Sequence, residues 1–381
     1  MRKEPSPVGS SCYSRTLILS MRDVESHVSR SYINEFENCI CSWEEADLIS
    51  IPHFSKTLTT KAANNFARQA FKLSGNPKIF NPVTNYFSLD KTYDLFFFIC
   101  QKPIDLLYLN SIQNWRSKCS QAVCLLDEVW LSTYAQEQKQ LAALKQFDHI
   151  FMNLNSSIKA VTNTIQKPCY HLAFGIDAVE FCPYPLLPQR SIDVCNFGRR
   201  SQAVHESLLE AGKRENFLYM YDTMKELFTT NYQAHRALYQ NIIKRSNYSI
   251  AYKAKFNLKS EVGEQEELNI RFFEAAAGGA VILGTPPQAE TFTQNFDWSD
   301  AVIELSSEAT NAAEVIAELN LQPERLKKIR KNNVVNSLLR HDWVYRWGQI
   351  LDRVGLSHTP KMAQRRASLQ SLADMALQKS S

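Results

Sequence analysis

The 381-residue sequence has few glycines, no long hydrophobic run and almost no excess of charge of either sign. Its longest apolar run, from Leu95 to Cys100, is far shorter than the roughly 18 residues needed to cross a bilayer. Near the N-terminus only Thr16 to Met21 is apolar, against about 7–15 residues in the hydrophobic region of a secretory signal. These absences argue against a membrane-spanning or secreted protein, and we expect a cytoplasmic one.

The charge and the cysteines exclude further classes. Lys and Arg number 43 against 39 Asp and Glu, a net charge of +4. Nucleic-acid-binding proteins usually concentrate basic residues in one patch, so we do not expect a nucleic-acid partner. The nine cysteines form no CxxC pair, and Cys39 and Cys41 have no histidine nearby to complete a zinc site. We therefore expect reduced thiols and no metal centre.

Glycine is distributed unevenly along the chain. Only Gly9 and Gly75 lie in the first 174 residues, and the other nine glycines lie from Gly175 onward. Tight turns and the close approach of a backbone to a ligand need glycine. The second half of the chain is therefore the better candidate for binding a phosphate group.

Short apolar runs alternate with helical stretches in both halves, which predicts an α/β fold. Pro183, Pro185 and Pro188 interrupt the alternation and indicate a linker between two domains. We expect two Rossmann-like domains that face each other across a cleft, because ligands of open α/β sheets bind at the carboxyl ends of the strands. The expected strands are 15–21, 47–51, 94–100, 122–126, 149–154, 170–174, 193–197, 217–221, 248–252, 280–283 and 301–304, and a long helical tract is expected over 323–354.

The most informative segment is 264–287, where a helix over 268–277 ends at a glycine pair and leads into a strand. Glu267, Arg271 and Glu274 share one face of that helix and could form an exposed ion-pair ladder, worth about 0.2–0.5 kcal/mol per pair. Glu274, however, lies between two phenylalanines and three alanines. An acid in so apolar a setting needs a partner, and a ribose diol would supply two hydroxyl donors.

These residues carry a resemblance to a known family. The pattern Asn269-x-Arg271-x-x-Glu274-Ala-Ala-Ala-Gly-Gly, followed by a strand and Gly-Thr285, resembles the donor-site signature of group 1 glycosyltransferases of the GT-B fold. It is most similar to the branch of spore-coat maturation glycosyltransferase-like proteins. The passages 174–183, 194–200 and 340–346 resemble further parts of that family in the same order, so the resemblance covers roughly residues 170–355.

The resemblance implies a glycosyltransferase that uses a nucleotide-diphosphate sugar as cosubstrate, with neither cofactor nor metal. It implies that Glu274 binds the ribose and that Arg199 or Arg200 can neutralise the diphosphate. The implied domains are an acceptor domain over 1–182, a donor domain over 183–340, a helix over 341–358 that crosses back, and a flexible tail or short appended helix over 359–381. The expected donor-binding residues are Gly198, Arg199, Arg200, Lys255, Glu266, Asn269, Arg271, Glu274 and Thr285.

Asp127, at the end of an expected strand, and His149, at the start of one, are candidates for catalysis on the acceptor side, although both could be structural. The spacing of Glu266 and Glu274 fits the E-x7-E pattern of retaining members. The glycines that the family carries between these acids are missing here, which leaves two alternatives open: a non-catalytic scaffold or regulatory subunit, and a sugar-nucleotide epimerase of the same fold.

The acceptor could be a glycan, a lipid-linked glycan, a protein or a small molecule. Three basic residues in the tail could make a weak peripheral contact with an anionic membrane, worth about 1 kcal/mol each at best. They are Lys361, Arg365 and Arg366.

Overall fold

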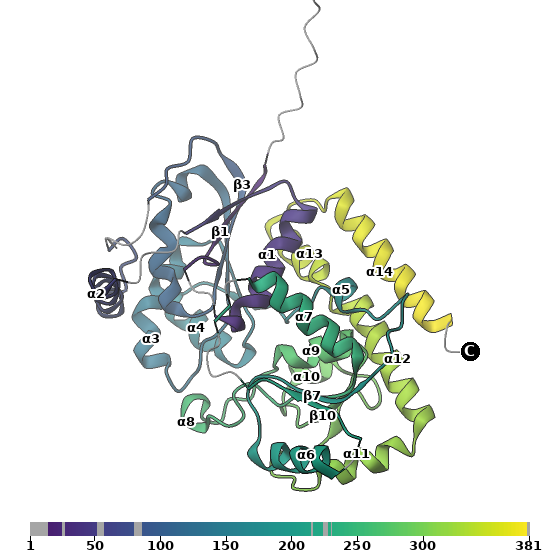
Figure 1. Ribbon diagram of the computed structural model, residues 1–381. Helices are drawn as coiled ribbons and strands as arrows, with labels where there is room; N and C mark the ends of the chain where they lie inside the picture. Colours follow the sequence, from purple (N-terminus) through teal and green to yellow (C-terminus); the bar gives the residue numbers. More distant parts are fainter. Residues whose placement is uncertain are drawn as a thin grey trace, which may run out of the picture.

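A computed structural model describes residues 14–24, 27–51, 57–79, 86–214, 216–223, 228–229 and 231–378. It contains two sheets, both entirely parallel, each covered by helices (Figure 1). The strand order is β2-β1-β3-β4-β5-β6 in the first sheet and β11-β10-β9-β7-β8 in the second. The α/β class and the arrangement of two Rossmann-like domains are therefore as predicted.

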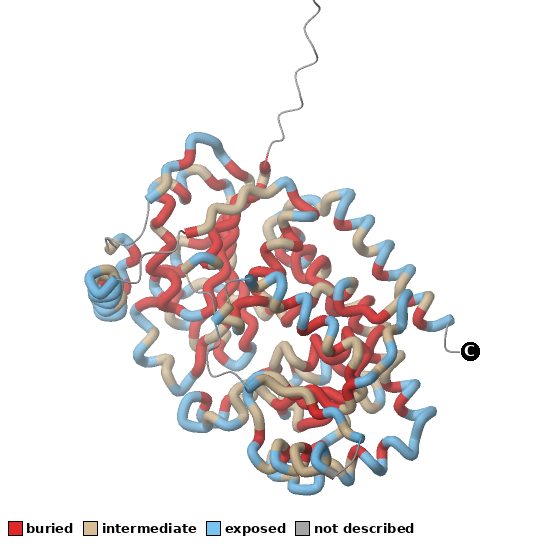
Figure 2. The backbone as a smooth tube through the Cα atoms, viewed as in Figure 1, coloured by how far each residue is buried: buried red, intermediate tan, exposed pale blue. Residues whose placement is uncertain are grey.

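The first domain contains β1 (Thr16–Ser20), α1 (Ser31–Trp43), β2 (Ala46–Ser50), α2 (Leu58–Ser74), β3 (Tyr93–Cys100), η2 (Pro103–Ser111), β4 (Cys119–Leu126), α3 (Tyr134–Leu141), β5 (His149–Met152), η5 (Asn155–Ser157), α4 (Ile158–Ile165) and β6 (Cys169–His171). Its central strands are the continuous apolar runs of the sequence, and Leu95 to Cys100 of β3 is buried on both faces. Figure 2 shows this buried core running through the sheets, with exposed residues on the outer helices.

The second domain contains α5 (Ala178–Phe181), β7 (Ile192–Asn196), α6 (Gln202–Arg214), β8 (Tyr219–Tyr221), α7 (Tyr232–Arg245), β9 (Ser246–Ile250), α8 (Lys259–Val262), α9 (Ile270–Ala277), β10 (Val281–Gly284), α10 (Glu290–Asn295), β11 (Ile303–Glu304), α11 (Ala312–Asn320), α12 (Pro323–Arg340), α13 (Trp343–Val354) and α14 (Pro360–Gln378). The predicted linker lies between the last strand of the first sheet and the first strand of the second.

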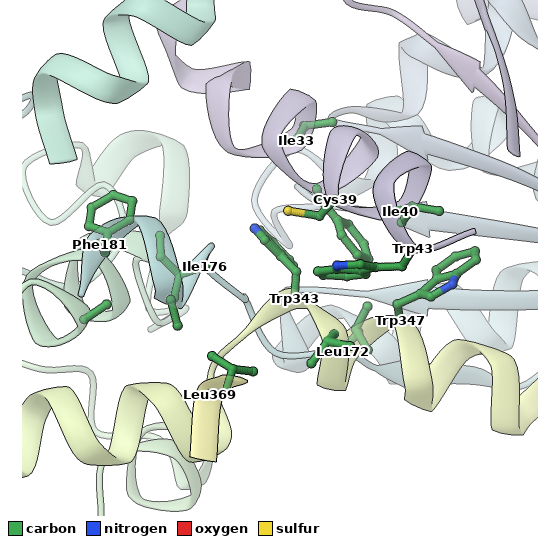
Figure 3. Packing of buried hydrophobic residues seen from close by; sticks show 14 of the residues in the cluster. Ile33, Cys39, Ile40, Trp43, Leu172, Ile176, Phe181, Trp343, Trp347 and Leu369 are labelled. Atoms are coloured by element: carbon green, nitrogen blue, oxygen red, sulfur yellow. The ribbon is translucent and has the colours of Figure 1, made fainter. Parts of the chain in front are cut away.

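The helical tract expected over 323–354 is two helices, α12 and α13. The helix is interrupted because Asp342 has an extended backbone and its carboxylate accepts from the N–H of Val344 at 2.9 Å, which caps α13. Helix α13 then packs on the first domain, as the crossover predicts. Trp343 stacks on Phe36 of α1 with ring centroids 4.4 Å apart, and Trp347 lies in the same cluster (Figure 3).

Of the two alternatives expected for 359–381, the flexible tail is wrong for the described part, which forms a helix, and that helix is longer than expected: the 19-residue α14 along α12 (Figure 1). Met362, Leu369, Ala373 and Ala376 are fully buried, so the helix is part of the core. Arg365 forms ion pairs with Asp177 and Asp342. None of the helices that the model describes is long and apolar enough to cross a membrane.

Candidate functional site

A tight turn follows β7 at the carboxyl edge of the second sheet. Gly198 has a φ of +90°, and its N–H donates to the carboxylate of Asp222 at 3.2 Å. Arg200 donates to the same carboxylate at 2.5 Å and to the carbonyl oxygen of Asp222 at 2.6 Å. Arg199 is exposed and forms no ion pair with any residue described. Of the two arginines predicted to bind the diphosphate, Arg200 is therefore already paired with an acid, and Arg199 is the one whose guanidinium group has no acidic partner among the described residues.

Arg271 of α9 points toward this turn. The nearest atom to a Cβ added at Gly198 would be a guanidinium nitrogen of Arg271, at 3.9 Å. The guanidinium group donates to Glu274 at 2.7 Å and stacks on the ring of Tyr239, 4.6 Å from its centroid. It retains 30% exposure, so it is fixed in direction and still accessible. Arg199 and Arg271 thus lie on the same side of the domain as the turn.

Glu274 is buried, with 1% of its surface exposed. One carboxylate oxygen accepts from Arg236 and the other from Arg271. Burial alone would raise the pKa of Glu274, but the two guanidinium groups outweigh it and hold that pKa below its ordinary value. Two arginines therefore supply the donors that the buried carboxylate needs, and its contact with a ribose stays a prediction. The exposed ion-pair ladder is wrong, because the Arg271–Glu274 pair is largely buried.

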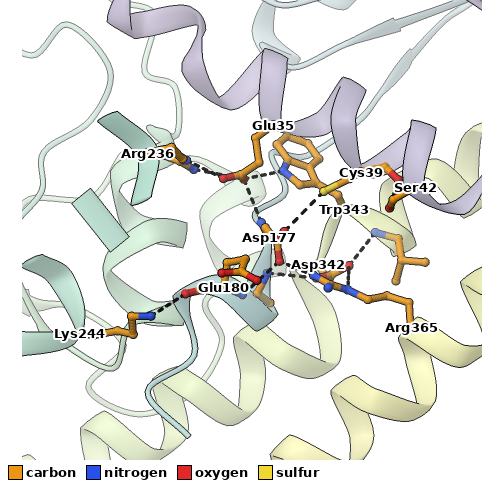
Figure 4. A network of polar contacts seen from close by, with 12 residues as sticks. Glu35, Cys39, Ser42, Asp177, Glu180, Arg236, Lys244, Asp342, Trp343 and Arg365 are labelled. Atoms are coloured by element: carbon orange, nitrogen blue, oxygen red, sulfur yellow. Dashed lines mark hydrogen bonds and ion pairs between the residues drawn. The ribbon is translucent and has the colours of Figure 1, made fainter. Parts of the chain in front are cut away.

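The charge network continues into the first domain (Figure 4). Arg236 of α7 donates to Glu35 of α1 at 2.6 Å, and both side chains are 8% exposed. Glu35 also accepts from the Trp343 indole at 2.9 Å and from the N–H of Asp177 at 3.0 Å. A continuous set of buried charges therefore joins α1 to the guanidinium group beside the Gly198 turn.

Two other predicted donor-binding residues have local structural roles. Asn269 is the N-cap of α9, where its side chain accepts from the N–H of Arg271 at 3.2 Å. Thr285 follows β10, and its hydroxyl donates to the carbonyl of Leu305 at 3.2 Å. Both lie at the carboxyl edge of the second sheet, where they shape the site.

Glu266 lies at the rim of a cavity between the domains. Its carboxylate pairs with Lys253 and accepts from the N–H of Gln288 at 2.6 Å. Partial burial acts to raise the pKa of Glu266, but these two donors hold it below its ordinary value. The cavity has a volume of about 550 Å³, and residues of both domains line it, among them Ser132 and Ser156 of the first domain and Glu266 and Gln288 of the second.

Two contacts close the cleft beside this cavity. Lys255, which follows β9, donates to Glu128 of the first domain at 3.1 Å and lies over the ring of Trp130. Glu267 accepts from the N–H groups of Asn155 and Ser156, at 3.2 and 3.0 Å, at the start of the helical segment after β5. The predicted phosphate ligand Lys255 is therefore used between the domains.

Asp127 lies at the end of β4, on the first-domain side of the same cleft. It is 2% exposed and accepts a hydrogen bond from the hydroxyl of Tyr32. Its other oxygen, Oδ1, is buried without a hydrogen-bond partner. Burial, reinforced by the neighbouring charge of Glu128, raises the pKa of Asp127 to about 8 despite the Tyr32 hydrogen bond. The predicted catalytic candidate is therefore a buried carboxyl group with an unused hydrogen-bonding atom.

His149 is not close to these residues. It begins β5, at the amino end of a strand whose carboxyl end faces the cleft, so about 10 Å of strand separates it from that edge. Burial lowers the pKa of His149, but no residue of the site contributes to this shift. His149 begins β5 as the sequence predicts, and it is not brought together with the other predicted site residues, so its catalytic role stays a prediction.

Sequence reasoning missed Glu35, Arg236 and the interdomain role of Glu267. Glu35 carried no distinct signal, because the stretch 33–40 also contains Asn34, Glu37 and Asn38 and does not look like a buried segment. The sequence did not identify its partner either, because Arg236 lies about 200 residues further along. Among the described residues, no group of three or more His, Cys, Asp or Glu side chains could hold a metal ion.

Two parallel-sheet domains with the site between them and a helix that returns to the first domain define the GT-B class of fold. Residues 208–352 match the family model described as glycosyl transferase-like. The resemblance to group 1 glycosyltransferases is thereby confirmed, while the spore-coat branch stays a prediction. No curated protein sequence matches this chain.

Solved structures agree with the GT-B fold. One is an α-glucosyltransferase in complex with UDP and a 13-mer DNA containing a HMU base, with a TM-score of 0.55 and 11% identity over 90% of this chain and 99% of that one. Another is Anabaena HepE in complex with UDP-glucose, with a TM-score of 0.53 and 11% identity over 90% of this chain and 100% of that one. At such low identity the likeness shows the fold alone.

Proposed function

We propose that this chain is a glycosyltransferase that transfers a sugar from a nucleotide-diphosphate sugar to an acceptor. The match of residues 208–352 to the glycosyl transferase-like family supports this activity. The binding of UDP or UDP-glucose by two proteins of the same fold supports a nucleotide sugar as the donor. The donor would lie on the second domain and the acceptor on the first.

The observation that carries the proposal is the position of Arg271 beside the Gly198 turn. Its guanidinium group is held by Glu274 and Tyr239 and remains partly exposed. A diphosphate bound there would accept hydrogen bonds from Arg271 and Arg199, which would stabilise the charge that develops as the sugar leaves. These cations would supply that stabilisation without a metal. We assign Glu274 the role of holding Arg271 in place, and not that of binding the ribose.

On the acceptor side we assign Asp127 the role of positioning the acceptor; its Oδ1 has no partner within the protein and is buried, so direct contact with an acceptor hydroxyl requires the cleft to open. The spacing of Glu266 and Glu274 supports retention of the anomeric configuration. If a hydrolysable donor such as UDP-glucose binds, NMR of the first sugar released tests this, since retention gives the α-anomer and inversion the β-anomer.

Titration calorimetry of the whole chain with UDP, GDP and ADP tests the proposal. At least one nucleotide should bind, and Arg271→Ala should weaken it by about 10- to 100-fold, the worth of a hydrogen bond to a charged group. Arg325→Ala is the matched control, because the Arg325–Asp300 pair is partly exposed and joins the first turn of α12 to the segment before β11, so it involves no residue of the proposed site. Binding of none of the nucleotides, or equal losses of affinity in both variants, would contradict the proposal.

The alternative of an epimerase is tested by incubation of the chain with a nucleotide sugar and no acceptor. A change in the configuration of the sugar would then indicate the epimerase.

A further inference from the structure

Helix α2 presents an apolar stripe to the outside of the first domain. Leu58, Phe66 and Leu73 are 86%, 76% and 72% exposed. At 3.6 residues per turn these three side chains project within about 80° of one another, so they form a single stripe along the helix. In Figure 1, α2 lies at the outer side of the first domain, away from the second domain.

The opposite side of α2 fixes this orientation. Ala67 and Phe71 are buried in the core of the first domain, and the hydroxyl of Tyr108 donates to the side chain of Asn64 at 3.0 Å. Gly75 ends the helix with a φ of +66°, packed so closely on α3 that an added Cβ would lie 2.2 Å from the carbonyl oxygen of Lys139. The stripe therefore faces outward as a consequence of packing.

The charged residues of the segment that contains α2 have one sign. The sequence contains no Asp or Glu between Asp47 and Asp90, although 22% of the whole chain is charged. Within α2 the cations are Lys61, Arg68 and Lys72, which project together along one flank of the stripe. Lys61 and Lys72 are exposed. An amphipathic helix with apolar residues beside a purely cationic flank is the type that binds anionic membrane surfaces.

We propose that α2 is a docking surface for an anionic lipid bilayer. Leu58, Phe66 and Leu73 would enter the boundary between headgroups and acyl chains, while Lys61 and Lys72 would contact lipid phosphates. This inference does not depend on the glycosyltransferase activity. It also differs from the contact expected of the tail, where Arg365 is held in ion pairs and Arg366 lies over the ring of Tyr345.

Two other occupants fit these residues less well. A second copy of the chain, related by a twofold axis through α2, would bring the cationic flanks of the two helices close to each other. The phosphates of a nucleic acid could pair with the lysines, but its backbone has no apolar region into which the three apolar side chains could be buried. A bilayer of anionic lipid matches both the stripe and its flank.

Sedimentation of the full-length protein with lipid vesicles tests the inference. We expect binding to phosphatidylcholine vesicles that contain about one third phosphatidylserine, and much weaker binding to phosphatidylcholine alone. Phe66→Glu with Leu73→Glu should reduce binding at least about tenfold, since it removes the apolar contact, and Lys61→Glu with Lys72→Glu should also reduce it. Leu321→Glu is the matched control, because Leu321 is 82% exposed in the second domain.

The α2 variants should unfold at the same temperature as the wild type, since all four side chains are exposed. Failure to bind anionic vesicles, or an equal loss of binding in Leu321→Glu, would overturn the inference. Binding of a DNA duplex through Lys61 and Lys72, without binding of vesicles, would also overturn it. So would a dimer of the chain that dissociates in the variant Phe66→Glu with Leu73→Glu.

Discussion

Arg236 of the second domain donates from its Nε atom to the carboxylate of Glu35 of the first domain at 2.6 Å, and both side chains are buried. The same guanidinium group donates to Glu274 through another nitrogen. A buried cation between two carboxylates, one from each domain, therefore connects the domain interface to the helix that carries Arg271. Such a pair contributes mainly through the cost of breaking it, because an unpaired buried charge is strongly unfavourable.

Substitution Glu35→Gln should lower the free energy of unfolding by about 1–3 kcal/mol. The amide keeps the shape and one acceptor but loses the charge, and it leaves Arg236 with Glu274 alone. Urea denaturation measures the change. Glu45→Gln, at an exposed acid that follows α1, is the control and should lie within about 0.5 kcal/mol of the wild type. If Glu35→Gln is as stable as the wild type, the ion pair between Glu35 and Arg236 does not stabilise the contact between the two domains.

Substitution Glu274→Gln should weaken binding of the nucleoside diphosphate by about 10- to 100-fold, because Arg271 loses the charge that holds it. A comparison with the 2′-deoxy form of the same nucleotide separates two roles of this residue. If Glu274 positions Arg271, the preference for ribose over deoxyribose is the same in both proteins. If Glu274 binds the ribose, as the sequence resemblance implied, that preference disappears in the variant.

Asp127 should make stability depend on pH. Its pKa is about 8 in the folded chain, where burial favours the neutral form, and about 3.9 in the unfolded chain. Between these values the folded state holds the proton that the unfolded state has lost, so stability falls as pH rises. Relative to Asp127→Asn, the wild type should lose stability from about pH 4 to about pH 8 and then level off.

Denaturant unfolding of both proteins across this range measures the difference, and a difference independent of pH would contradict the burial of Asp127. Tyr32→Phe provides a second check. It removes a hydrogen bond that lowers the pKa of Asp127, so the upper end of the window should move to higher pH.

Substitution Gly175→Ala should destabilise the protein by about 1–3 kcal/mol, as is typical of overpacking in a core. A Cβ at this position would lie 2.4 Å from the ring of Trp343, which is itself fully buried where α13 meets the first domain. Gly212→Ala is the control. Gly212 lies within α6, and the nearest atom to an added Cβ would be the carbonyl oxygen of Phe217 at 3.6 Å, an ordinary contact, so the change should be neutral or slightly stabilising. Thermal unfolding distinguishes the two, and equal effects would contradict this packing.

Much of the fold follows from local patterns in the sequence. The strand β3 is predictable because a run of six apolar residues suits a strand buried on both faces, and α9 because its glycine pair ends it. Helix α14 was expected only as one alternative, although its buried residues Met362, Leu369, Ala373 and Ala376 recur at spacings of seven, four and three, which place them on one helical face. These spacings do not identify its packing partner, α12.

The site was predictable only in part, for the same physical reason. The sequence indicated that Glu274 is buried and needs donors, and both statements hold. It could not identify Arg236 as one donor, because that contact depends on how α7 packs against α9. His149 begins β5 as predicted, but a strand start in a parallel sheet lies at the edge opposite to the carboxyl ends, where the site residues are.

The central claim is that Arg271, held by Glu274, binds the diphosphate of a donor beside the Gly198 turn. A crystal structure of the full-length protein with a bound nucleoside diphosphate tests it most directly. We expect phosphate oxygens within about 3 Å of the Arg271 guanidinium nitrogens, with the Arg271–Glu274 pair intact. A diphosphate bound elsewhere, or one that leaves Arg271 without a phosphate contact, would contradict the account.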